Sequence, residues 1–219
     1  MSSGSNGSPT DEEAITGVAY SWSRVLRETI EQNLRLFERR DTSLAQAPAA
    51  VAITVVMSGG EPAVPIFQRP QSMSRHAGQM ALPGGRVHGG EDAEACALRE
   101  LEEELGLTLP REAVLGRLDD FDTRSGFTIT PVVVWSGADA ARLRPSAAEV
   151  ARLFLVSAAV LRRAVAAASK VPPDEFSLRF PEVEVFAPTA AMLYQFSEVA
   201  LDGRPCRVVD FFQPAWTHR

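Results

Sequence analysis

The sequence of 219 residues has few of the residues that stabilise small secreted domains or bind nucleic acid. Its only cysteines, Cys96 and Cys206, are too few for a disulfide framework and do not have the spacing of a zinc site. The sequence has 22 Lys and Arg and 28 Asp and Glu, so acidic residues are in excess and the formal net charge is −6. Non-specific nucleic-acid binding needs a basic surface. We therefore expect a reducing, cytoplasmic environment and no nucleic-acid partner.

Long hydrophobic runs are absent as well. The longest uncharged stretch, 42–60, holds one near-continuous apolar segment, 49–57. That segment is too short to cross about 30 Å of hydrocarbon and suits a buried strand. The first residues have neither the basic nor the apolar region of a signal peptide, and their Ser, Gly, Asn and Pro content predicts a disordered tail over 1–18. We expect no membrane partner.

The rest of the chain alternates helical and extended patterns, which predicts one mixed α/β domain over 46–219 preceded by an N-terminal helix and linker over 19–45. Helices are predicted at 22–39, 92–105, 157–170 and 189–201, and strands at 49–57, 63–68, 113–118, 127–135, 149–156, 183–187 and 206–212. Two of these strands contain a proline. Pro65 predicts a weakened strand or an edge position, and Pro131 predicts an edge position or a bulge.

The segment 85–107 places three carboxylates on one face of its helix. Glu100 precedes Glu103 and Glu104 by three and four residues, so all three lie on neighbouring positions. The middle of a helix offers no dipole compensation for such crowded anions. Hard divalent cations such as Mg²⁺ or Mn²⁺ would relieve the repulsion, because they prefer carboxylate oxygens. The alternative is a solvated acidic helix face.

The spacing within this segment favours the metal site. It reads Gly85, five residues, Glu91, seven residues, Arg99-Glu100-Leu101, one residue, Glu103-Glu104, one residue, Gly106-Leu107. This pattern resembles the Nudix box of the Nudix hydrolases, with every specified position filled. The resemblance implies an α/β/α sandwich with a mixed β-sheet and a loop–helix–loop metal site.

The resemblance also implies roles for individual residues. Glu100, Glu103 and Glu104 are the implied ligands of Mg²⁺ or Mn²⁺, together with a carbonyl of Gly84 or Gly85. The same three carboxylates and Arg99 are the implied catalytic groups, while Gly85, Glu91 and Gly106 hold the box in shape. The implied reaction is metal-assisted attack of water on a diphosphate. The proton acceptor stays open between Glu103 and acids outside the box, namely Glu149, Glu182, Asp119, Asp120 and Asp122.

A basic stretch lies directly before the carboxylate helix. Residues 62–90 contain no Asp or Glu, but they contain Arg69, Arg75, Arg86, His76 and His88. Such side chains can receive phosphate oxygens, although ordinary surface-loop charge is the alternative.

Segments on both sides of the box, 68–85 and 115–135, resemble the coenzyme A pyrophosphatases of the Nudix group. The resemblance implies substrate binding by Arg69, Arg75, His76 and Gln79. Two positions depart from that pattern: Ser74 stands where the subgroup has Arg, with Arg75 one place later, and Leu82 stands where it has Phe.

The implied activity is the divalent-metal-dependent hydrolysis of coenzyme A or acyl-coenzyme A to 4′-phosphopantetheine, or its acyl form, and adenosine 3′,5′-bisphosphate. Two alternatives stay open. One is the same chemistry on ADP-ribose, dinucleotides or nucleoside triphosphates, and the other is a non-catalytic Nudix-like ligand sensor. A small nucleotide is the expected partner. The N-terminal helix packs on the domain or mediates a homodimer.

Overall fold

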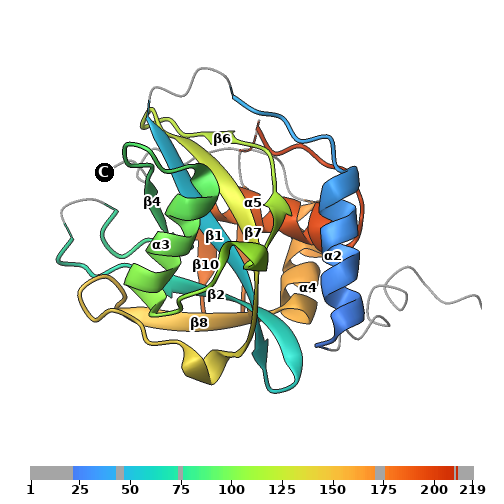
Figure 1. Cartoon of the computed structure of the whole chain (residues 1–219), viewed down its shortest axis with the longest axis horizontal. Helices are drawn as coiled ribbons and strands as arrows, with labels where there is room; N and C mark the ends of the chain where they lie inside the picture. The colour runs from blue at the N-terminus through green and yellow to red at the C-terminus, as the bar shows by residue number, and fades with distance from the viewer. Residues whose placement is uncertain (1–21, 43–46, 74–75, 171–175, 210, 212–219) are drawn as a thin grey trace, which may run out of the picture.

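A computed structural model describes residues 22–42, 47–73, 76–170, 176–209 and 211, in which helices cover both faces of a mixed sheet (Figure 1). The predicted fold class is confirmed. The elements in chain order are α2 (Arg24–Leu36), β1 (Pro48–Ser58), β2 (Glu61–Gln68), β3 (Met80–Ala81), β4 (Gly84–Arg86), α3 (Ala93–Leu105), a 3₁₀ turn (Arg111–Ala113), β5 (Val114–Arg117), β6 (Phe121–Asp122), β7 (Thr128–Asp139), a 3₁₀ turn (Ala140–Arg142), β8 (Arg152–Ser157), α4 (Ala158–Ala168), β9 (Ser177–Arg179), β10 (Glu184–Phe186), α5 (Thr189–Gln195) and a π-helical segment (Phe196–Leu201).

Strand β1 lies at the centre of the sheet and has different partners along its length. It runs parallel to β7, with Pro48 opposite Thr128 and Val55 opposite Trp135. On its other side, its first residues pair antiparallel with β4 and its last residues pair antiparallel with β2. This arrangement holds β4, and the loop that leads from it into α3, against the start of β1.

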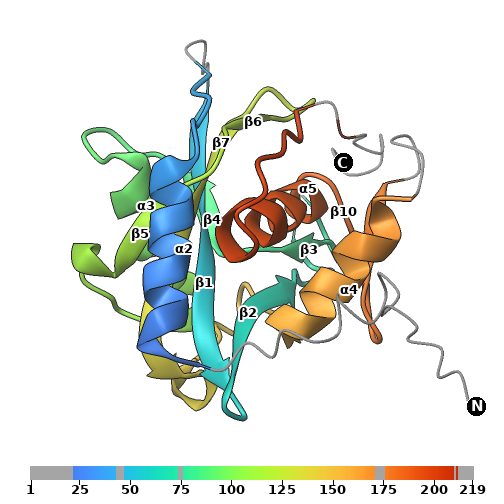
Figure 2. The same ribbon diagram turned by 90° about the vertical axis from the view of Figure 1, so that its right-hand side faces the viewer.

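The side chains of β1 divide the core into two layers. Ala50 and Ala52 belong to the layer that packs against α3, whereas Val51 and Ile53 belong to the layer under α2, α4 and α5. Figure 2 shows α4 and α5 on the side of β1 away from α3. Alternation along a strand produces this division, because successive side chains point to opposite faces.

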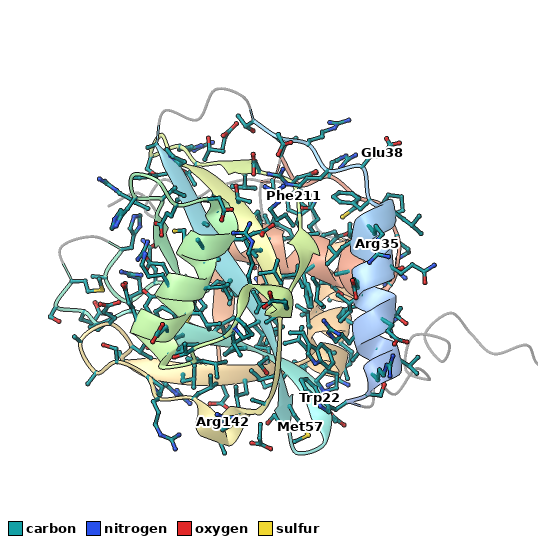
Figure 3. The ribbon with its side chains drawn as sticks, in the orientation of Figure 1. Trp22, Arg35, Glu38, Met57, Arg142 and Phe211 are labelled. Atoms are coloured by element: carbon teal, nitrogen blue, oxygen red, sulfur yellow. The ribbon has the colours of Figure 1, made fainter. Side chains whose placement is uncertain are left out.

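Helix α2 packs on the sheet, which is one of the two arrangements expected for it. It is shorter than the predicted 22–39, beginning after the N-cap Ser23 and ending at Leu36, and it buries Leu26, Ile30 and Leu34. The Trp22 ring stacks on Trp135 with centroids 4.1 Å apart. Figure 3 shows Trp22 at the end of the β1–β2 hairpin that carries Met57. The homodimer stays a prediction.

The predicted last strand is wrong, and so is an edge position for the two strands that contain proline. Residues 206–209 and 211 form no strand; the carbonyl of Cys206 instead accepts a hydrogen bond from Gln195 Nε2. Neither proline strand lies at an edge. Pro65 lies opposite Leu155 of β8, between the β2 residues that pair with β1 and those that pair with β3. Pro131 lies opposite Val51, between the β7 residues that pair with β6 and with β5. Each proline therefore lies where one partner strand has ended and the next has not begun. Because proline has no N–H to donate, such a gap avoids the loss of a ladder hydrogen bond.

The predicted tail at 1–18 lies outside the described residues. Among the helices of the described chain, none is both long and apolar enough to cross a membrane.

Candidate active site

Helix α3 begins at Ala93, one residue after the predicted start, and ends at Leu105 as predicted. The side chain of Asp92 caps the N-terminus by accepting a hydrogen bond from Ala95 N–H, and Gly106 closes the C-terminus with a φ of 64°. These caps fix which residues face the sheet. As a result Glu100 and Glu104 are buried, whereas the side chain of Glu103 is 53% exposed.

Glu104 is the most deeply buried of the three carboxylates, with 2% of its side chain exposed. Its Oε2 accepts a hydrogen bond from Gly84 N–H at 2.9 Å, and its Oε1 lies 3.5 Å from Arg69 Nη1. Burial disfavours the charged form more than these two donors favour it, and the negative charges of Glu100 and Glu149 add to the effect. Together they raise the pKa of Glu104 to about 8. The long contact with Arg69 thus offsets only part of the effect of burial on Glu104.

Glu100 lies directly against the backbone of β4. A Cβ atom added to Gly85 would lie 2.1 Å from Glu100 Oε1, so a side chain at position 85 would displace the carboxylate. The neighbouring Gly84 is equally confined, because a Cβ there would lie 2.5 Å from the carbonyl oxygen of Ala50. The two glycines allow the helix carboxylates and the sheet to approach this closely.

Arg99 links the loop before α3 to the carboxylates on it. Its guanidinium donates to both oxygens of Glu91, with Nη2–Oε1 at 2.8 Å and Nε–Oε2 at 3.2 Å. Its Nη1 donates to Glu100 at 2.7 Å and to Glu103 at 3.1 Å. These anions raise the pKa of Arg99 above its usual range. The ion pairs hold the loop and the helix in one arrangement, as a bidentate pair does.

Replacement of Glu91 with Gln is expected to destabilise the protein by about 1–2 kcal/mol at pH 7, the scale of a charge-assisted hydrogen bond. The hydrogen bonds from Arg99 and from His88 N–H lower the pKa of Glu91 from 4.5 to about 2. A lowered pKa in the folded state means that the stabilisation is present above pH 4.5 and is lost as the pH falls toward 2. Urea unfolding of both proteins at pH 7 and at pH 3.5 measures this. A difference in stability that grows on acidification would contradict the expectation.

The carboxylates are engaged with the chain's own donors. Within the described ranges, no group of three or more His, Cys, Asp or Glu side chains is gathered around one point as a ready metal centre. The contacts explain this, because Glu100 and Glu103 turn toward Arg99 while Glu104 turns toward Gly84 and Arg69. The oxygen-only donor set is nevertheless the type that Mg²⁺ and Mn²⁺ prefer.

A cavity of about 390 Å³ lies beside two residues that contact Glu104. Arg69 and Gly84, which contact Glu104, line it, and so do the predicted substrate residues His76 and Gln79. His76 Nδ1 lies 3.2 Å from Gln79 Oε1. Arg75, the fourth predicted substrate residue, lies outside the described residues, as does Ser74.

Sequence reasoning did not find the other walls of this cavity. They come from the segment before and at the start of β7 and from the region of β10 and α5; the residues are Thr123, Ser125, Phe127, Ile129, Val183, Glu184, Phe186, Ala187, Pro188, Thr189 and Met192. At one of them the Arg86 guanidinium lies over the ring of Phe127, 4.8 Å from its centroid. The first four of these residues lie in the segment 115–135 that resembles the coenzyme A pyrophosphatases, although no substrate role was predicted for them. The residues of the β10 and α5 region are mostly apolar and distant in sequence from the box, so no local motif marks them.

The acids proposed as proton acceptors outside the box lie in different surroundings. Ion pairs or hydrogen bonds engage four of them: Asp119 with Arg207, Asp120 with Arg39, Asp122 with Thr128, and Glu182 with Arg152. The fifth, Glu149, is the one whose charge raises the pKa of Glu104. It therefore remains a candidate, beside Glu103.

Comparison with known proteins identifies the family. A model of the NUDIX domain matches residues 46–192, which is more than half of the chain. The chain belongs to the NUDIX-domain family, and the resemblance predicted from the box is confirmed. Members of this family generally use divalent metal ions.

Two relatives show the level of similarity. The mouse protein named mitochondrial coenzyme A diphosphatase NUDT8 is 38% identical over 137 residues, covering 60% of this chain and 65% of that protein. A protein of Cronobacter sakazakii named uncharacterised Nudix hydrolase NudL is 40% identical over 96 residues, covering 42% of this chain and 48% of that one. The match thus spans about half to two-thirds of the length of these relatives. A solved structure of a C. elegans Ap4A hydrolase is 18% identical, with a TM-score of 0.46, and covers 68% of this chain and 95% of its own.

Proposed function

We propose that this protein is a divalent-metal-dependent hydrolase of the diphosphate linkage in nucleoside diphosphate derivatives, with coenzyme A or acyl-coenzyme A as the substrate. The observation that carries the proposal is the position of Glu104. Its buried carboxylate contacts Gly84 and Arg69, and both of these line the adjacent cavity. The two residues that contact Glu104 thus also form part of the wall of a substrate-sized cavity. The mouse relative named a coenzyme A diphosphatase supports the choice of substrate.

The residues fit a divalent cation. Burial and the neighbouring charge of Glu100 raise the pKa of Glu104, and a cation bound beside it would favour its charged form. We assign Glu100, Glu103 and Glu104 as ligands of Mg²⁺ or Mn²⁺, with a further oxygen from the Gly84 carbonyl. When bound, the ion neutralises the diphosphate and makes water a stronger acid.

The remaining roles follow from position. Arg69 contacts Glu104 and also lines the cavity, so its guanidinium can donate to a phosphate oxygen there. We assign substrate binding to Arg69, Arg75, His76 and Gln79. Arg99 orients Glu100 and Glu103, and Glu103 or Glu149 accepts the proton of the attacking water.

Two alternatives remain: hydrolysis of another nucleotide, and ligand sensing without hydrolysis. ADP-ribose, dinucleotides and nucleoside triphosphates contain the same linkage, and a ligand sensor would bind nucleotides without turnover.

We place the protein in the cytoplasm by its composition, whereas the mouse relative is named mitochondrial.

Product analysis tests the proposal. The full-length protein is incubated separately with coenzyme A, ADP-ribose, NADH and nucleoside triphosphates, in the presence of Mg²⁺ or Mn²⁺. We expect 4′-phosphopantetheine and adenosine 3′,5′-bisphosphate from coenzyme A. Turnover of another substrate alone would contradict the coenzyme A assignment. The absence of any turnover by folded protein would favour the sensor.

A further inference from the structure

The Arg86 side chain takes no part in the ion pairs of the carboxylate helix. Arg99 forms those pairs, and none of the ion pairs among the described residues includes Arg86. The Arg86 side chain is exposed, and its guanidinium lies over the ring of Phe127, 4.8 Å from the centroid. Its backbone is held by pairing with Ala49 in β1 and by a hydrogen bond from Arg99 Nη2 to its carbonyl at 3.2 Å. A fixed strand thus presents a guanidinium that can receive a ligand.

Alternation along β4 directs Arg86 to the side of the sheet that carries the cavity. A Cβ at Gly85 would meet a carboxylate of α3, so this position faces the helix. Gly84 and Arg86 face the opposite side, because successive side chains of a strand alternate. Gly84 lines the cavity, and so does Ala49, which pairs with Arg86. Phe127, on which the guanidinium lies, lines the cavity as well.

Arg86 is displaced along β4 from the place proposed for the diphosphate. Gly84 donates to Glu104 and lines the cavity, and Arg69 contacts the same carboxylate. Arg86 lies two residues farther along the strand, which is about 7 Å at the usual rise of a strand. One arginine therefore lies beside the diphosphate, and a second lies about one sugar unit away from it.

The acids at and beside the cavity wall have partners of their own. Glu184 of β10 pairs with Arg179 at 2.9 Å, and Asp122 of β6 accepts a hydrogen bond from Thr128 Oγ1 at 2.6 Å. A phosphate group at Arg86 would therefore meet an arginine that no described carboxylate neutralises. The basic residues that line or flank the cavity are Arg69, His76 and Arg86.

We propose that Arg86 is a specificity-determining residue, which binds a phosphomonoester on the ribose of the substrate and so selects nucleotides that carry this group over those that lack it. The inference rests on the proposed function, because it takes the diphosphate to bind beside Glu104. An arginine can donate two parallel hydrogen bonds to such a phosphate. The ring of Phe127 holds the guanidinium in place, because a cation is attracted to the face of an aromatic ring.

Binding to the full-length protein in EDTA, measured by calorimetry, tests the inference without turnover. Coenzyme A and 3′-dephospho-coenzyme A differ only in this phosphate. We expect coenzyme A to bind at least about tenfold more tightly, which one charge-assisted hydrogen bond suffices to produce. Arg86→Ala should bring the ratio below about threefold, because the donors to the phosphate are lost. Phe127→Leu should lower the ratio by about two- to fivefold, because it removes the ring that positions the guanidinium.

Arg142→Ala is the matched control. Arg142 is exposed like Arg86, but it ends the 3₁₀ turn that follows β7. That turn lies near Met57, toward the end of β1 opposite to Ala49 (Figure 3). The control should keep the ratio of the original protein. Thermal unfolding verifies that each variant is folded.

The outcomes separate this inference from the proposed function. Equal binding of the two ligands, no detectable binding of either, or a ratio that Arg86→Ala leaves unchanged would overturn the inference, even if coenzyme A is hydrolysed. A ratio that is lost in Arg86→Ala and kept in Arg142→Ala, without hydrolysis of either ligand in Mg²⁺ or Mn²⁺, would support the inference and refute the proposed hydrolysis.

Discussion

Replacement of Glu104 with Gln is expected to lower kcat/KM for coenzyme A by about 10³-fold. The substitution keeps the shape of the side chain, which is 2% exposed and contacts Gly84 and Arg69, but removes the carboxylate that would hold the cation. Metal ions contribute several kcal/mol to stabilising the charge of such transition states, and about 1.4 kcal/mol corresponds to a factor of ten. The rate of product formation at saturating Mg²⁺ measures the loss.

Glu102→Gln provides the matched control for this prediction. Glu102 lies on the same helix, but it is exposed and accepts a hydrogen bond from Thr108 Oγ1. The control should change kcat/KM by less than about twofold, as surface substitutions away from a site usually do. Equal losses in the two variants would show that charge on α3 in general, and not the buried carboxylate, supports activity.

Replacement of Gly85 with Ala is expected to reduce kcat/KM by about 10²-fold, through the position of Glu100. The added Cβ would lie 2.1 Å from Glu100 Oε1 and 2.5 Å from its Cδ, so the carboxylate has to move. A displacement of about 1 Å at a reacting centre can cost a factor of this size. The same crowding should destabilise the fold by about 1–3 kcal/mol. Steady-state kinetics and urea unfolding measure the two effects.

Gly89→Ala is the control, because a Cβ at Gly89 would meet nothing within 4 Å. It lies in the same box and should leave both activity and stability close to those of the original protein. If Gly85→Ala is as active as Gly89→Ala, the close approach of Glu100 to β4 has no part in the reaction.

The site's helix is predictable from sequence because its determinants are local. The caps Asp92 and Gly106 flank the helix directly, and the spacing of Glu100, Glu103 and Glu104 places them on neighbouring positions in any helix. Their unequal burial was not predictable in this way. The burial depends on contact between β4 and α3. The pairing of Ala50 in β1 with Gly85 in β4 holds β4 in that position.

The errors of the sequence analysis arise from distant partners. The apolar residues near Cys206 are typical of a strand, but Gln195 and Asp119 bind this segment through its backbone and through Arg207. Pro65 and Pro131 suggested edges, although gaps between successive partner strands admit them to interior strands. The apolar walls of the cavity come from segments far from the box, and their residues resemble ordinary core residues.

A metal site on the carboxylate helix is tested most directly by Mn²⁺ binding to the full-length protein without substrate, measured by electron paramagnetic resonance. We expect the protein and its Glu102→Gln variant to bind Mn²⁺ with the same affinity. Glu100→Gln and Glu104→Gln should each weaken binding by at least about tenfold, because each removes a charged oxygen ligand. Binding that is unchanged in both of these variants, or undetectable in the original protein, would contradict a metal site on the carboxylate helix.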